Sequence, residues 1–159
     1  MSVRQIKLGG LRILITYVSF DPGKRTGVTT WNEKGECIKS SIFLQPSLDV
    51  FLEALTHIST IKTFIVEEYR VYSHMAEAHI GSKIETAQVI GQIKSVARQM
   101  NVQVIEQAAI RLRIAAKWAQ VKVPPKGQHI RDDVSSYLHG YYYLHKKGII
   151  KAKVLEDES

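Results

Sequence analysis

Residues 13–23, ILITYVSFDPG, join an uninterrupted apolar, β-favouring run to an aspartate and a tight turn. The first eight of these residues are aliphatic, β-branched or aromatic apart from one serine, which predicts a buried strand. Asp21 ends the strand, and Pro22 biases it towards extended backbone geometry. Because Asp-Pro-Gly is also a common turn sequence, a purely structural aspartate is the alternative. An acid at the end of a buried strand suits a hard divalent cation if other acids join it.

The rest of the chain alternates strand and helix signals in the order β-β-β-α-β-α-β-α-α. Strands are expected over residues 13–20, 26–31, 36–44, 61–66 and 102–105, and helices from residue 47 and over residues 83–100, 108–119 and about 129–144. Hairpins followed by strand–helix units predict an α/β fold with a mixed sheet covered by helices. Ligands of such sheets gather at the carboxyl ends of the strands.

Composition narrows the classes of protein that fit. A length of 159 residues predicts one domain, with a core over about residues 12–146 and a charged tail over residues 151–159. The net charge of +7 favours a polyanionic partner such as nucleic acid. The lone Cys37 fits a reducing compartment, and neither a secretory signal nor a membrane-spanning run is apparent, so we expect a cytoplasmic protein.

Acidic residues stand at three places that the predicted fold can bring together. Asp21 ends the first strand, Glu67 and Glu68 end the fourth, and Asp132 and Asp133 begin the last helix. Successive strand residues point to opposite faces, so one glutamate is expected at the site and the other serves as the register alternative. The same choice applies to Asp132 and Asp133, since aspartate is favourable at any helix start. Carboxylates that converge in this way could hold two Mg²⁺ ions for phosphodiester cleavage.

The last predicted helix adds a histidine to the acids. His129 lies three residues before Asp132, which predicts that the two share a helix face as metal ligands or proton-transfer groups. A surface histidine at a helix start is the alternative. Ser136 and His139 continue that face, and the opposite side carries the expected core residues Val134, Tyr137, Leu138, Tyr141 and Tyr142.

Three segments, FDPGKRTGV at 20–28, FIVEEYRVY at 64–72 and HIRDD at 129–133, together resemble the RuvC family of Holliday-junction resolvases, and its phage-type members in particular. The resemblance covers about residues 12–146. It implies an RNase H-like fold with a five-stranded mixed sheet flanked by helices. It also implies a Mg²⁺-dependent endonuclease, in which Mn²⁺ can substitute, with two ions per site and paired nicks across a four-way DNA junction. The family's catalytic acids match Asp21, Glu67 and Asp132, with His129 where bacterial members have an aspartate.

The same resemblance implies a homodimer that binds branched DNA in a bacterial or phage-infected cell. The helix over residues 86–100 is a candidate dimer interface through Ala87, Val89, Ile90, Ile93 and Val96, with ordinary core burial as the alternative. Basic and aromatic residues near the acids are expected to contact phosphates or unpaired bases. These candidate DNA contacts are Lys24, Arg25, Tyr69, Arg70, Tyr72, His74, Arg111, Arg113, Lys117, Lys122 and Lys126.

Two other functions remain open at this point. One is an RNase H-like nuclease with broader flap or branched-DNA specificity, or a relative of the YqgF group that acts on RNA. The other is a nucleic-acid-binding module with a degenerate site, against which the complete set of acids argues.

Overall fold

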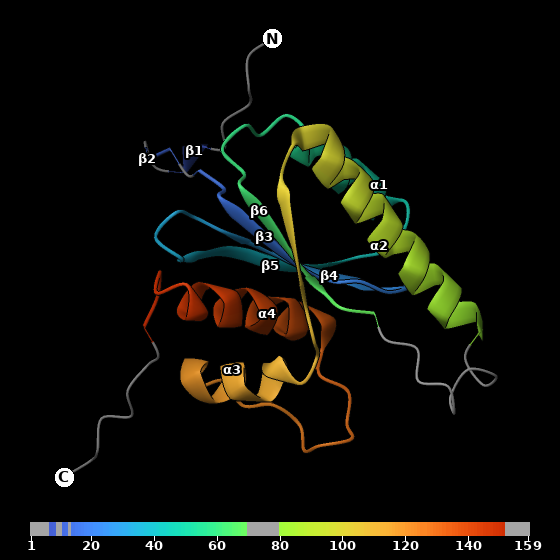
Figure 1. Ribbon diagram of the computed structural model, residues 1–159, viewed down its shortest axis with the longest axis vertical. Coiled ribbons are helices and arrows are strands. Elements are labelled where there is room, and N and C mark those ends of the chain that lie inside the picture. The colour runs from blue at the N-terminus through green and yellow to red at the C-terminus, as the bar shows by residue number, and fades with distance from the viewer. Residues whose placement is uncertain (1–6, 9–10, 13, 70–79, 152–159) are drawn as a thin grey trace.

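A computed structural model describes residues 7–8, 11–12, 14–69 and 80–151 of the chain. Its centre is a five-stranded mixed sheet in the order β5-β4-β3-β6-β7, which confirms the predicted fold class (Figure 1). The strands are β3 (Tyr17–Asp21), β4 (Thr26–Trp31), β5 (Cys37–Phe43), β6 (Thr63–Glu67) and β7 (Gln103–Gln107). Pairing is antiparallel from β3 through β4 to β5 and parallel from β3 through β6 to β7.

The central pair of strands is the one that the apolar runs predict. Val18 and Phe20 of β3 and Phe64 and Val66 of β6 are fully buried. The first predicted strand begins later than expected, since β3 starts at Tyr17 and extends through Asp21. A short hairpin of β1 (Lys7–Leu8) and β2 (Leu11–Arg12) precedes the sheet and was not predicted.

The helices form one layer on each face of the sheet (Figure 1). They are α1 (Ser47–Leu55), α2 (Ile80–Met100), α3 (Arg111–Ala119) and α4 (Asp132–Lys146). Val18 and Phe20 face α1 and α2 and share a hydrophobic core with them, whereas Trp31 belongs to a second core with α3 and α4. This division follows from alternation along the strands, whose successive side chains point to opposite faces. None of the described helices combines the length and the apolar content of a membrane span.

The apolar residues of helix α2 pack against the core of the same chain. Val89, Ile90 and Ile93 are 4%, 7% and 0% exposed, and Val96 packs against the same core. For these residues the alternative, ordinary core burial, therefore holds, because the 3.6-residue apolar period faces the sheet. Of the five candidates, Ala87 is the exposed one.

Helix α4 lies against the sheet through a polar face. Ser19 of β3 donates a hydrogen bond to the carbonyl of Ser136 at 2.6 Å, and the hydroxyls of Thr29 and Ser136 lie 2.8 Å apart. The indole nitrogen of Trp31 donates to the Ser19 hydroxyl at 3.0 Å. A Cβ on Gly140 would overlap the Trp31 indole, so the helix approaches the sheet more closely than a side chain at that position would allow.

The predicted orientation of α4 is therefore wrong in part. Ser136 and His139, expected on the side away from the core, are fully buried, while Leu138 and Tyr141 are buried as expected. Val134, Tyr137 and Tyr142 are only partly buried. The helical pattern alone does not reveal the burial of Ser136 and His139, because partners such as Thr29 come from strands that are distant in the sequence.

Candidate active site

Three carboxylates come together at one edge of the sheet. Asp21 is the last residue of β3 and Glu67 the last residue of β6. These strands run parallel with Phe20 opposite Val66, so the two acids extend side by side. Asp132, the first residue of α4, reaches the same place from the layer below the sheet. All three line one cleft with a volume of about 930 Å³.

Glu68 and Asp133, the alternatives to Glu67 and Asp132, do not line the cleft. The backbone N–H of Glu68 donates to the carbonyl of Gln107 at 2.9 Å. Glu68 lines a neighbouring hollow with Tyr69 and is absent from the lining of the cleft. Asp133 accepts two hydrogen bonds from the Arg131 guanidinium, both at 2.7 Å. These bonds hold the pKa of the Asp133 carboxyl below its usual range. The cleft therefore contains Glu67 and Asp132, the member of each pair that the family resemblance implies, whereas strand alternation alone leaves the choice of glutamate open.

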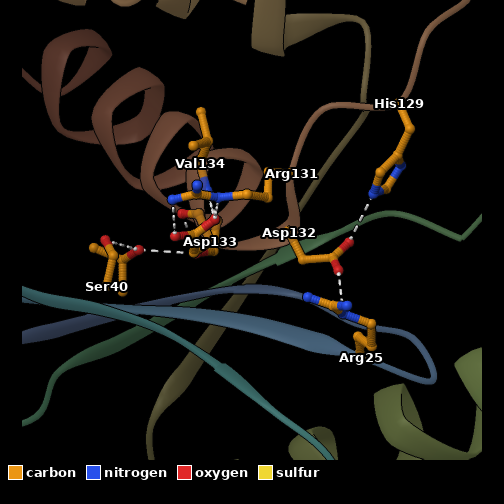
Figure 2. Close-up of polar contacts among 9 residues, drawn as sticks. Arg25, Ser40, His129, Arg131, Asp132, Asp133 and Val134 are labelled. Atoms are coloured by element: carbon orange, nitrogen blue, oxygen red, sulfur yellow. Dashed lines mark hydrogen bonds and ion pairs between the residues drawn. The ribbon is translucent and has the colours of Figure 1, made fainter.

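His129 lies in the loop before α4 rather than in its first turn, because the helix begins at Asp132. Its Nε2 lies 3.2 Å from one carboxylate oxygen of Asp132, and Arg25 Nε lies 3.5 Å from the other. Figure 2 shows Asp132 between these two side chains. The prediction that His129 and Asp132 share a helix face is wrong, although the loop still brings the two side chains into contact. His129 is 75% exposed, whereas Asp132 is 14% exposed.

Negative charge is concentrated in the interior of the cleft. The pKa of the Asp21 carboxyl is raised well above its ordinary value, first by burial and then by the charge of Glu67, with a smaller contribution from Asp132. A hydrogen bond from Ser135 lowers this pKa but does not cancel the rise. Both electrostatic causes disfavour a buried anion, and both would be relieved by a cation between the carboxylates.

The donor chemistry of the cleft fits a hard cation such as Mg²⁺, which prefers carboxylate oxygens. Among the described residues, no group of three or more His, Cys, Asp and Glu side chains is already arranged to hold a metal ion. Asp132 is engaged by Arg25 and His129, and Glu67 by His139, whose Nε2 lies 2.7 Å from Oε2 of Glu67. A bound cation would therefore have to compete with Arg25 and His129 for Asp132.

Four of the predicted DNA contacts line the cleft. They are Lys24, Arg25, Arg113 and Lys126. Arg113 donates hydrogen bonds to the carbonyls of Pro124 and Pro125 at 2.6 and 3.0 Å, so this guanidinium fixes the loop that carries Lys126. The cleft thus has an acidic interior and a basic rim, which is the charge distribution expected for a phosphodiester substrate.

The other candidates lie away from the acids or outside the described residues. Arg111 stacks over the Tyr142 ring at 5.6 Å, Lys117 and Lys122 are exposed outside the cleft lining, and Tyr69 packs against the core. Arg70, Tyr72 and His74 fall outside the residues that the structure describes.

The sequence does not single out Ser135 or Gln107, whereas His139 lies on the predicted face of His129 and Asp132. Ser135 bonds Asp21, His139 bonds Glu67, and Gln107 bonds His139 in turn. Ser135 could have been found from spacing, because residues 132, 135 and 139 recur at helical intervals.

Comparison with known proteins identifies the fold. No protein-family model matches the sequence, and neither does any curated protein. RuvC from Thermus thermophilus in complex with a Holliday-junction substrate matches with a TM-score of 0.58 and 15% identity, over 87% of this chain and 99% of that one. A second T. thermophilus RuvC structure gives 0.51 and 16%, over 86% and 99% of the two chains. The yeast mitochondrial Holliday-junction resolvase Ydc2 gives 0.54 and 12%, over 86% and 81%. The chain therefore has the fold of these resolvases, as its sequence motifs predict.

Proposed function

We propose that this protein is a Holliday-junction resolvase, a nuclease that cuts branched DNA by paired phosphodiester nicks. The observation that carries the proposal is the convergence of Asp21, Glu67 and Asp132 in a basic-rimmed cleft, on the fold of proteins that resolve junctions. Because its substrate is DNA, we expect the enzyme to act in the cytoplasm of a bacterial or phage-infected cell.

Different residues of the chain would have different roles in such a reaction. Asp21, Glu67 and Asp132 would hold Mg²⁺ or Mn²⁺, two ions per site, with His129 beside Asp132 as a further ligand or proton-transfer group. When bound, the ions supply charge neutralisation and an activated water. Lys24, Arg25 and Lys126 on the rim would bind backbone phosphates and orient the strand over the acids.

A structure-selective cleavage assay tests this function. The purified protein is expected to nick a synthetic four-way junction in Mg²⁺ or Mn²⁺, and to leave linear duplex intact. Flap DNA and an RNA–DNA hybrid serve as comparison substrates. Equal cleavage of flaps or hybrids would point to a nuclease of broader specificity, and binding without cleavage would show a non-catalytic module.

Arg25→Ala is expected to weaken junction binding and to flatten its salt dependence. Each phosphate contact contributes about 0.9 to the slope of log K against log salt, so the slope should fall in magnitude by about that amount. The measurement is a fluorescence anisotropy titration in EDTA at several salt concentrations. Arg98→Ala, which changes an exposed arginine of α2 outside the cleft, is the matched control. An unchanged slope for Arg25→Ala would place this arginine outside the DNA path.

A homodimer would supply the two sites that paired nicks require. The apolar stripe of α2 is occupied by its own core, so an interface on this helix would have to use the opposite side. Ile84, 52% exposed, lies on α2 beyond that stripe. Sedimentation velocity of the wild type and of Ile84→Glu tests this interface, and a dimer unaffected by the substitution would exclude it.

A further inference from the structure

A fully buried histidine contacts the site without lining the cleft. His139 of α4 is 0% exposed, and its Nε2 lies 2.7 Å from Oε2 of Glu67. Its other ring nitrogen, Nδ1, lies 3.0 Å from the side-chain nitrogen of Gln107. The same Gln107 nitrogen lies 3.1 Å from the backbone carbonyl of His139. Both ring nitrogens are thus engaged, one by an acid and one by an amide.

These contacts determine which ring nitrogen carries the proton. A carbonyl oxygen only accepts hydrogen bonds, so the Gln107 atom that faces it must be the NH₂ nitrogen. One N–H of this amide goes to the carbonyl, and the other faces Nδ1 of His139. Nδ1 therefore accepts and carries no proton, which places the ring proton on Nε2, directed at Glu67.

The identity of this tautomer decides what His139 does to Glu67. The Nε2–H donates to Oε2 of Glu67 and holds that carboxylate oxygen in place. Gln107 is held in its turn, because β7 pairs with β6 so that Glu67 and Gln107 stand opposite each other.

We propose that His139 and Gln107 are positioning residues that orient the Glu67 carboxylate for cation binding. The proposal rests on the proposed function and extends it to a network beneath the site. Hydrogen-bond partners of metal ligands commonly fix ligand orientation, and their loss costs about 10- to 100-fold in metal affinity or activity.

The geometry of α4 supports this role. Asp132, Ser135 and His139 follow one another at intervals of three and four residues, which brings them to one face of the helix. Asp132 lines the cleft, Ser135 bonds Asp21 and His139 bonds Glu67. One helix face thus contributes an acid and holds the other two, and the contacts with Ser19 and Thr29 fix that face against the sheet.

The first test compares His139→Leu, which removes the N–H, with His139→Gln, whose amide can donate from nearly the same place. We expect His139→Leu to raise the Mg²⁺ concentration for half-maximal junction cleavage about 10- to 100-fold, with DNA affinity in EDTA unchanged. Mn²⁺ binding without DNA, followed by calorimetry, should weaken by a similar factor. His139→Gln should recover most of both, which a purely structural role would not predict. A folded His139→Leu with wild-type Mn²⁺ affinity would overturn the proposal.

The second test needs no variant to fold and no cleavage to occur. The ¹⁵N resonances of the His139 ring, in metal-free wild-type protein, should show an unprotonated Nδ1 and a protonated Nε2. A proton on Nδ1 would overturn the assignment even if His139→Leu fails to fold. If the wild type cleaves no branched substrate while the tautomer is as expected, the proposed function fails and the geometry stands.

Discussion

Asp21→Asn is expected to lower the rate of junction cleavage by about a thousandfold or more while leaving junction binding intact. The substitution keeps the shape of the side chain and removes its charge, so it weakens cation binding without removing a phosphate contact. A loss of several kcal/mol of charge stabilisation corresponds to a rate change of this size. Single-turnover cleavage in Mg²⁺ measures the rate, and anisotropy in EDTA measures the binding.

The same substitution is expected to stabilise the metal-free protein. Because the pKa of Asp21 is raised in the folded state, this carboxyl favours folding at low pH. That contribution is complete below the unfolded pKa and is lost as the pH rises through the folded pKa. At neutral pH in EDTA the Asp21 carboxyl therefore costs stability relative to a neutral side chain of the same shape, and asparagine removes that cost.

Calorimetry in EDTA should therefore show a higher melting temperature for Asp21→Asn than for the wild type. Glu33→Gln, which neutralises an exposed acid in the turn after β4, is the control and should change neither rate nor stability. Cleavage by Asp21→Asn at the wild-type rate would show that Asp21 is not a catalytic residue. Loss of folding would instead mean that its role is structural.

Gly27→Ala is expected to damage both folding and catalysis. Gly27 of β4 stands opposite Asp21 across the β3–β4 pair, and a Cβ on it would overlap the backbone carbonyl of Asp132. Backbone cannot rotate away as a flexible side chain can, so the start of α4 must move. Overpacking of this kind costs about 3 kcal/mol. Urea unfolding should show that loss, and cleavage should fall because Asp132 is displaced from Asp21.

Gly91→Ala provides a matched control within α2. A Cβ at Gly91 meets nothing within 4 Å, and alanine is the better helix former. This variant should gain about 0.5–1 kcal/mol and cleave at the wild-type rate. If Gly27→Ala unfolded at the wild-type midpoint and retained full activity, the close approach of α4 to β4 would not matter for the site.

The strands of the sheet could be predicted from sequence because each of them is indicated by its own continuous stretch of residues. The apolar runs at residues 13–20 and 61–66 indicate the two central strands. The end of each run also indicates where its strand ends. The juxtaposition of Asp21 and Glu67 then follows from parallel pairing. The spacing from His129 favours Asp132 over Asp133, and Asp132 lines the cleft in the structure.

What could not be predicted depends on partners from distant parts of the chain. The helical pattern places Ser136 and His139 on the face of His129 and Asp132, away from the core. In the structure both are buried and form hydrogen bonds with the Thr29 hydroxyl and the Glu67 carboxylate. His129 looks helical by spacing, yet α4 begins at Asp132. The apolar stripe of α2 could equally have faced a second subunit or its own sheet, and periodicity alone does not distinguish these two uses.

The two hydrophobic cores lie on opposite faces of the sheet, and the site forms only when the layers on both faces are folded. Asp21 and Glu67 belong to the sheet, whereas Asp132 and the hydrogen bonds of Ser135 and His139 arrive with the α3–α4 layer. Partial unfolding that lifts this layer would abolish the acid cluster while the core under α1 and α2 persisted. The free energy of that local opening, which amide hydrogen exchange along α4 reports, therefore sets the fraction of molecules in which the three acids are assembled.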